Sequence, residues 1–175
     1  MGSIRQGIVV MTGRGGSDLE HPDALIERAA ATIAVVNAAH CGEPVLYCDP
    51  SHPRELYTAA FPGVPLIMPA SSKRKSVLDA VTSAWKLRYQ PIVLIPDTFA
   101  LSGAHYLAEA ARALAAGGCD VVLGPAAEGG WTLLGFKFPE RTLIKSVDWC
   151  SSSVAAETEA LCASSNLSLV LLPKV

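Results

Sequence analysis

One carboxylate stands directly after one of the most apolar runs of the sequence. Asp97 follows the run PIVLIP, residues 91–96, which has the composition of a buried strand. A carboxylate at the carboxyl end of a central strand is well placed to hold Mg²⁺ or Mn²⁺ bound to the phosphates of a nucleotide. A loop carboxylate can instead accept backbone hydrogen bonds and only cap a turn. The position after a strand favours the first interpretation, a metal ligand.

A glycine-rich segment, TGRGGSD, follows the first apolar run and offers backbone N–H groups to a ligand. It contains Gly13, Arg14, Gly15 and Gly16. Amides in such a loop can cradle a phosphate group. The spacing matches neither the dinucleotide fingerprint G-x-G-x-x-G nor the P-loop pattern. A phosphate loop and a flexible connector are therefore equally supported interpretations.

A second glycine-rich segment, GPAAEGGW, covers residues 124–131. Gly129 and Gly130 let a ligand approach the main chain closely, because they carry no Cβ. Glu128 beside them is a candidate for binding a second metal or a hydroxyl group. The same Gly-Gly pair is typical of a tight hairpin between two strands. The two interpretations are compatible, and we expect both.

The sequence lacks the motifs that would indicate several other kinds of functional site or binding partner. The four histidines show no metal-ligand spacing, and there is no G-x-S-x-G nucleophile elbow. The five cysteines form no C-x-x-C pair, so buried reduced thiols are expected. A net charge of -2 with one basic cluster, Lys73 to Lys75, argues against a nucleic-acid partner. Because no apolar run reaches the roughly 18 residues of a membrane span, we expect a cytoplasmic protein without membrane contact.

The elements that must position these residues alternate along the chain. Strands are expected at residues 7–11, 44–48, 64–68, 91–96, 120–125, 131–138 and 167–173, and helices at 22–41, within 49–63, and at 73–89, 104–116 and 151–163. Apolar strands separated by helices indicate a mostly parallel sheet covered on both faces. We therefore expect one α/β domain over residues 1–175, a three-layer α/β/α sandwich. Ligands of such sheets bind at the carboxyl ends of the strands.

Several runs resemble a known family. VVLGPAAEGGWTLLGF is similar to a segment of a bacterial glycosyltransferase-like family in the nucleotide-diphospho-sugar transferase superfamily. That family has the GT-A fold, which is Rossmann-like, and is related to molybdenum-cofactor and phospholactate guanylyltransferases. VLYCDPSHP, YQPIVLIPDTFALSGAHYLAEAARAL and VDWCSSSVAAETEAL resemble its other elements in the same order, so the likeness extends from about Gly7 to Pro173. It implies nucleotidyl or glycosyl transfer with Mg²⁺ or Mn²⁺ at Asp97.

The sequence departs from the family at the ligand-binding edge. Only Arg14 stands where the family has several basic residues, and Ala127 with Glu128 replaces a consecutive pair of acids. The segment with further aspartates that the family carries after its last strand has no counterpart following LLPKV. These departures leave a transferase and a protein that keeps only the fold as alternatives.

Two hypotheses therefore stand. In the first, a nucleotide or nucleotide sugar is the partner, and the roles are phosphate binding by Arg14 and the backbone of Gly13, Gly15 and Gly16, metal binding by Asp97, and acceptor or sugar binding by Glu128, Gly129 and Gly130. In the second, the chain is a non-catalytic binding or regulatory protein. A homo-oligomer or a protein partner that supplies missing acids stays open under both. A nicotinamide-binding protein is disfavoured, because the first loop lacks the fingerprint.

Overall fold

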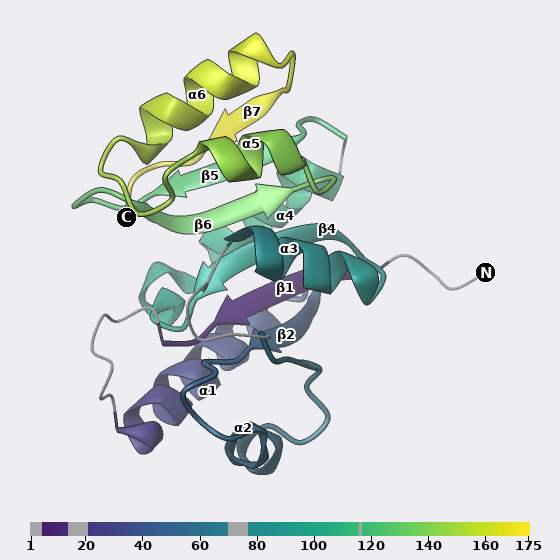
Figure 1. The fold of residues 1–175 in the computed structure, drawn as a ribbon, viewed down its shortest axis with the longest axis vertical. Coiled ribbons are helices and arrows are strands. Elements are labelled where there is room, and N and C mark those ends of the chain that lie inside the picture. Colours follow the sequence, from purple (N-terminus) through teal and green to yellow (C-terminus); the bar gives the residue numbers. More distant parts are fainter. Residues whose placement is uncertain (1–4, 14–20, 70–76, 116) are drawn as a thin grey trace.

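A computed structural model describes residues 5–13, 21–69, 77–115 and 117–175 of the chain. Its centre is a seven-stranded sheet with the order β3-β2-β1-β4-β6-β5-β7 (Figure 1). The strands are β1 Arg5–Met11, β2 Glu43–Tyr47, β3 Leu66–Ile67, β4 Tyr89–Pro96, β5 Val121–Pro125, β6 Trp131–Phe136 and β7 Leu169–Leu171. β6 is antiparallel to β4 and β5, and the other neighbouring strands are parallel. The expected mostly parallel sheet is confirmed.

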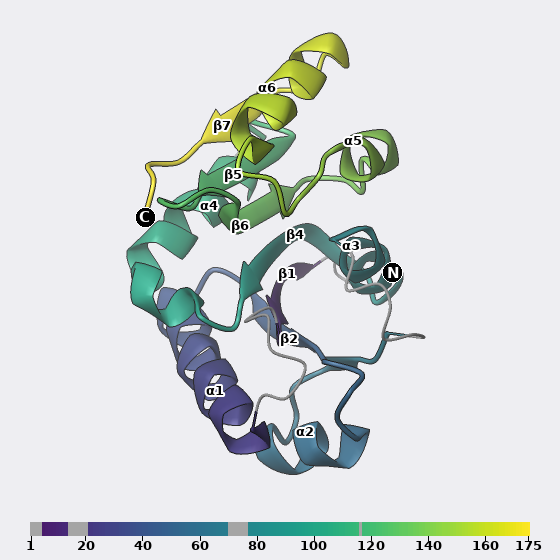
Figure 2. The ribbon, with the colours of Figure 1, turned by 60° about the vertical axis from the view of Figure 1, so that its left-hand side comes forward.

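Helices cover both faces of the sheet. They are α1 Pro22–Ala39, α2 Arg54–Ala60, α3 Val77–Lys86, α4 Gly103–Ala115, α5 Arg141–Ser146 and α6 Val154–Ser164, with a 3₁₀ turn, η1, at Phe99–Ser102. Figure 2 shows α1 and α4 on one side of the strands and α3 and α5 on the other. The predicted three-layer α/β/α arrangement is thus confirmed.

The two faces follow from the alternation of side chains along each strand. In β1, Ile8 and Val10 pack in a core with buried residues of α1 and α4, whereas Val9 and Met11 pack in a second core with α3, α5 and α6. All four side chains are at most 2% exposed. A strand that is apolar on both faces is what a helix-covered parallel sheet requires. β1 is therefore a central strand of the fold.

Some local expectations were wrong. Helix α1 ends at Ala39, slightly before the expected end at about Cys41, because His40 takes a left-handed conformation with φ of 49°. Trp85 is 49% and Leu87 44% exposed, although both are large apolar residues of the segment expected to form the helix at 73–89. Trp85 lies at the margin of the buried stripe, and Leu87 follows the last helical residue, Lys86. Helix α5 and turn η1 were not predicted at all.

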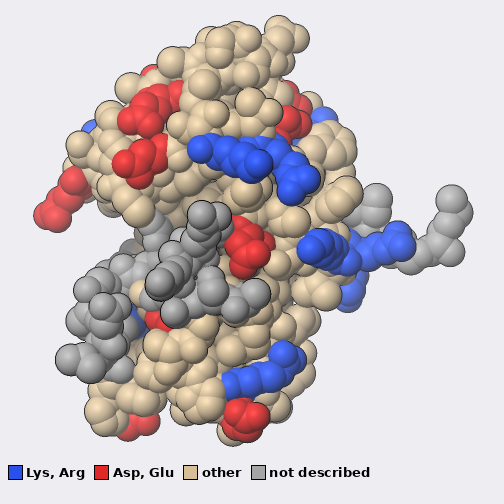
Figure 3. Space-filling model, in the orientation of Figure 1, with Lys and Arg blue, Asp and Glu red and all other residues tan. Residues whose placement is uncertain are grey.

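The cysteines and the surface complete this description. All five cysteines are free thiols, and Cys48, Cys119 and Cys162 are buried as expected, but Cys150 is exposed. On the face drawn in Figure 3, acidic and basic side chains of the described residues are interspersed. Within the described parts of the chain, no helix combines the length and the apolar character needed to cross a bilayer.

Candidate functional site

The centre of the sheet brings the ends of two parallel strands together. β1 and β4 are neighbours, with Met11 paired to Pro96, and the helices that follow them in the sequence are α1 and α4. The backbone N–H of Asp97 donates to the carbonyl of Met11 at 3.1 Å. β2, the strand that follows β1 in the sequence, lies on one side of this pair, and β5, which follows β4, lies on the other side, beyond β6. The strand order therefore reverses between β1 and β4. Open α/β sheets bind their ligands at such a point.

Asp97 occupies this position with its carboxylate buried. The residue is 1% exposed, and its Oδ2 accepts hydrogen bonds from the backbone N–H of Gly13 and from Nη2 of Arg28, each at 3.2 Å. Its carbonyl accepts a hydrogen bond from the hydroxyl of Thr32 at 2.7 Å. Burying a charged carboxylate is unfavourable unless it is paired and hydrogen-bonded. Arg28 and Gly13 provide that compensation on one oxygen.

The other oxygen of this carboxylate is different. Oδ1 of Asp97 is buried and has no hydrogen-bond partner among the residues that the structure describes. A buried acceptor without a partner is uncommon in folded proteins and points to an absent ligand, water or ion. One carboxylate oxygen is therefore held by the protein, and the other is left for a donor or a cation.

Arg28 is the functional residue that sequence reasoning missed. It lies within α1, four residues before Thr32, and both side chains reach Asp97. Its side chain is 27% exposed, which is low for an arginine on a surface helix. The available signal was its place between Leu25 and Ala29 on the buried side of an otherwise apolar helix face. A charge in that position indicates a buried partner.

The Gly-Gly segment forms the turn between β5 and β6, as expected for a hairpin. The N–H of Ala126 donates to the carbonyl of Gly130 at 3.3 Å, and the N–H of Gly129 donates to Ala126 at 3.2 Å. Gly129 and Gly130 have φ values of 97° and 77°, a region that side-chain-bearing residues rarely adopt. A Cβ on Gly129 would lie 2.9 Å from the Cα of Ser152, whereas a Cβ on Gly130 would point into open space.

A cavity of about 410 Å³ joins the two motifs. Its lining residues are Pro96, Asp97, Thr98, Ala126, Gly129, Gly130, Trp131, Thr132, Trp149 and Cys150. The volume is within the range of small-molecule sites. The structure thus brings Asp97, Gly129 and Gly130 to one cavity, which we call the Asp97 cavity.

The remaining predicted site residues have different positions. Glu128 is exposed in the β5–β6 turn and is not among the residues that line the Asp97 cavity. Gly13 lies at the end of β1 and contacts the carboxylate through its N–H. Arg14, Gly15 and Gly16 lie outside the described residues.

A second strand-end acid, Asp49, has a local structural role. It is 8% exposed, and its Oδ1 accepts hydrogen bonds from the N–H and the hydroxyl of Ser51 at 2.9 and 2.6 Å. Its own N–H donates to the hydroxyls of Thr12 and Tyr57 at 2.8 and 3.0 Å. Burial raises the pKa of Tyr57 to about 12. Asp49 therefore caps the turn after β2. Capping a turn is the same structural role that the sequence also allowed as the second interpretation of Asp97.

A divalent cation fits the chemistry of Asp97 only with help from its ligand. Mg²⁺ and Mn²⁺ prefer oxygen donors, and nucleotide sites commonly combine one or two carboxylates with substrate phosphates. Among the described residues, no three His, Cys, Asp or Glu side chains gather to hold a metal. The buried, unpartnered Oδ1 of Asp97 supplies one oxygen donor. The residues present thus suit a cation that arrives bound to phosphate.

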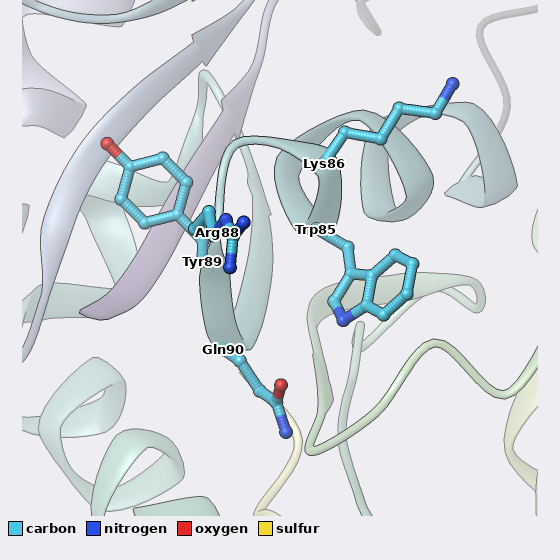
Figure 4. Close-up of a pocket in the computed structure, with 5 residues that line it drawn as sticks. All are labelled: Trp85, Lys86, Arg88, Tyr89 and Gln90. Atoms are coloured by element: carbon cyan, nitrogen blue, oxygen red, sulfur yellow. The ribbon is translucent and has the colours of Figure 1, made fainter. Parts of the chain in front are cut away.

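A second cavity, of about 340 Å³, lies at the other end of β4. It is lined by Trp85, Lys86, Arg88, Tyr89 and Gln90 (Figure 4). In Figure 4, Trp85 and Gln90 extend on the same side while Lys86 points away from them. Tyr89 begins β4 and Pro96 ends it, so this cavity is separated from the Asp97 cavity by the length of the strand.

Several solved structures have a fold similar to that of this chain. A Desulfovibrio desulfuricans G20 protein assigned to the nucleotide-diphospho-sugar transferases has a TM-score of 0.69 and 18% identity, over 97% of this chain and 80% of that one. Rv0371c from Mycobacterium tuberculosis H37Rv, solved with manganese, has a TM-score of 0.58 and 17% identity, over 99% and 89%. Molybdopterin-guanine dinucleotide biosynthesis protein A from Archaeoglobus fulgidus has a TM-score of 0.58 and 11% identity, over 96% and 83%.

These likenesses establish the fold, which is that of GT-A-like nucleotidyltransferases and sugar transferases. None of the curated proteins matches the sequence. Residues 32–151 match the family described as "Uncharacterized protein conserved in bacteria (DUF2064)". That match covers well over half of the chain and includes Arg28's partner Asp97 together with the Gly129–Gly130 turn. The chain belongs to the DUF2064 family.

Proposed function

We propose that the protein binds a nucleotide or nucleotide sugar, together with Mg²⁺ or Mn²⁺, and transfers a nucleotidyl or glycosyl group. The ligand occupies the Asp97 cavity at the carboxyl ends of β1 and β4. The observation that carries this proposal is the carboxylate of Asp97, buried at this edge with its Oδ1 unpartnered among the described residues. The similar folds of a protein assigned to the nucleotide-diphospho-sugar transferases and of Rv0371c, which was solved with manganese, support it.

The roles of individual residues follow from their chemistry. Asp97 contributes an oxygen to the cation, which neutralises phosphate charge and orients the ligand. Gly130 presents main chain to the cavity without a side chain in the way, since a Cβ there meets nothing within 4 Å. Arg14, with the backbone of Gly15 and Gly16, holds phosphates, whereas the N–H of Gly13, the other residue expected there, is bonded to Asp97. Glu128 serves the sugar or acceptor from the turn outside the cavity lining.

One observation favours a second candidate, a non-catalytic binding or regulatory protein. The ion pair with Arg28 already compensates the charge of Asp97. No cluster of three potential metal ligands occurs in the described parts of the chain. Under this alternative, Asp97 anchors α1 to β4 and needs no cation.

Titration calorimetry separates the two candidates. A panel of nucleoside triphosphates and nucleotide sugars, each with and without Mn²⁺, is titrated into the wild type, Asp97→Asn and Asp49→Asn. Asp49→Asn is the matched control, because it makes the same change at a buried strand end outside the Asp97 cavity. We expect one ligand to bind with Mn²⁺, and Asp97→Asn to weaken that binding by roughly tenfold or more, the value of an ionic contact.

The control variant should bind as the wild type does. Absence of binding across the panel at millimolar ligand contradicts the proposal and favours the non-catalytic alternative. Binding that is unchanged in Asp97→Asn would instead mean that the ligand site is elsewhere.

A further inference from the structure

The ion pair between Arg28 and Asp97 joins a helix to the residue that the proposed function gives to a metal. Nη2 of Arg28 lies 3.2 Å from Oδ2 of Asp97, and the carboxylate is 1% exposed. The arginine side chain is also largely covered, with 27% of its surface exposed. This pair is shielded from solvent, so salt and water screen it far less than a surface pair.

A guanidinium at this distance opposes the binding of a second cation to the same carboxylate. A cation on Oδ2 would have to replace the hydrogen bond from Arg28. A cation on Oδ1 would avoid that, but it would lie next to the guanidinium across a single carboxylate. Like charges held that close repel strongly in a buried environment. Either mode of binding is weakened by Arg28.

Resting on the proposed function, we propose that Arg28 and a divalent cation compete for the negative charge of Asp97. Arg28 is thus a positioning residue that sets the metal affinity of the site. It keeps the carboxylate compensated in the absence of ligand, and its charge repels a cation that binds the other oxygen, Oδ1. An ionic hydrogen bond of this kind lowers metal affinity by on the order of 10- to 100-fold.

The proposal predicts a gain on mutation, which a merely structural role would not give. Loss of a structural arginine weakens every property of the site. Loss of a competing cation instead strengthens the binding of metal. In Arg28→Gln we therefore expect Mn²⁺ to bind at least tenfold more tightly than in the wild type, and the gain to require Asp97.

The experiment is an electron paramagnetic resonance titration with Mn²⁺ alone, which reads free and bound ion directly. It compares the wild type, Arg28→Gln, Arg28→Gln/Asp97→Asn and Arg112→Gln. The last is the matched control, because Arg112 is exposed on α4 and its loss changes the net charge equally. Arg112→Gln should leave the Mn²⁺ affinity as in the wild type, and the double variant should abolish the gain.

A variant with a smaller change guards against loss of the fold. Arg28→Lys keeps the charge but loses the planar fork that fits a carboxylate. It should raise the Mn²⁺ affinity less than Arg28→Gln does, while its circular dichroism stays that of the wild type. Equal or weaker Mn²⁺ binding in folded Arg28 variants overturns the proposal, and so does a gain that persists without Asp97.

Failure of the proposed function would look different. If no nucleotide or nucleotide sugar binds to the wild type or to Arg28→Gln, the proposed function fails. A tenfold gain in affinity for Mn²⁺ alone would still support the competition between Arg28 and the cation.

Discussion

Gly129 and Gly130 offer a matched pair of substitutions that tests the geometry of the Asp97 cavity. Both glycines have positive φ, so alanine is strained at either position. They differ in what the added methyl group meets. At Gly129 it lies 2.9 Å from both Cα and Cβ of Ser152, and at Gly130 it meets nothing within 4 Å. Gly130→Ala is therefore the control for the backbone strain in Gly129→Ala.

The expected stabilities can be worked from these contacts. Forcing alanine to positive φ costs about 1–2 kcal/mol. The smaller conformational freedom of the unfolded chain returns about 0.4–1 kcal/mol, so Gly130→Ala should lose between about 0 and about 1.6 kcal/mol. Gly129→Ala carries in addition the displacement of the Ser152 backbone, and overpacking of this kind costs about 1–3 kcal/mol. The difference between the two variants should be about 1–3 kcal/mol.

Urea unfolding followed by circular dichroism measures this difference. In a thermal melt of a chain of this length, each kcal/mol of lost stability lowers Tm by about 2–4 °C. Gly130→Ala should be the more stable variant and yet bind the ligand more weakly than Gly129→Ala. The reason is that the methyl group at Gly130 projects into open space beside the cavity. If Gly129→Ala is as stable as Gly130→Ala, the packing of the turn against Ser152 is not as described.

Two further predictions concern groups outside the ion pair. Burial raises the pKa of Tyr57 to about 12 from 10.0, so the folded state keeps this proton longer than the unfolded state. The stability it contributes is complete below pH 10 and is lost as pH rises through about 12, so Tyr57→Phe should flatten the decline of the urea midpoint over that range. Equal slopes for both proteins would contradict this. Cys150 is exposed, whereas burial raises the pKa of Cys48 to about 12. A disulfide reagent at pH 8 should therefore react rapidly with Cys150, and Cys150→Ser should remove the fast phase. A fast phase that persists in the variant would refute the assignment.

Much of the fold could be predicted because apolar runs determine its strands. The runs at Gly7–Met11 and Pro91–Pro96 fall within β1 and β4, and the Gly-Gly pair makes the β5–β6 turn. The missed helix α5, Arg141–Ser146, has only six residues, too few for a helical period to show. The two buried side chains that hold it, Leu143 and Ile144, are fixed by tertiary packing.

The candidate site could be predicted only in part. The sequence placed Asp97, Gly129 and Gly130 at one edge because the carboxyl ends of strands meet there. The position of Arg28 on the buried side of α1 indicates a buried partner, but the sequence could not show that this partner is Asp97, 69 positions away along the chain. The chemistry of this edge depends on a contact between distant segments, which only the fold creates.

The residues just past three strand ends continue the hydrogen bonding of the sheet. The N–H of Thr12 donates to the carbonyl of Tyr47, and the N–H of Asp97 donates to the carbonyl of Met11. The N–H of Asp49 donates to the hydroxyls of Thr12 and Tyr57. All three residues are at most 8% exposed. Their amides should therefore exchange with deuterium as slowly as those of the strands, although they stand in loops. Of the three, Asp97 lines the cavity, and its main chain is ordered before any ligand arrives, so little binding free energy is lost in fixing it.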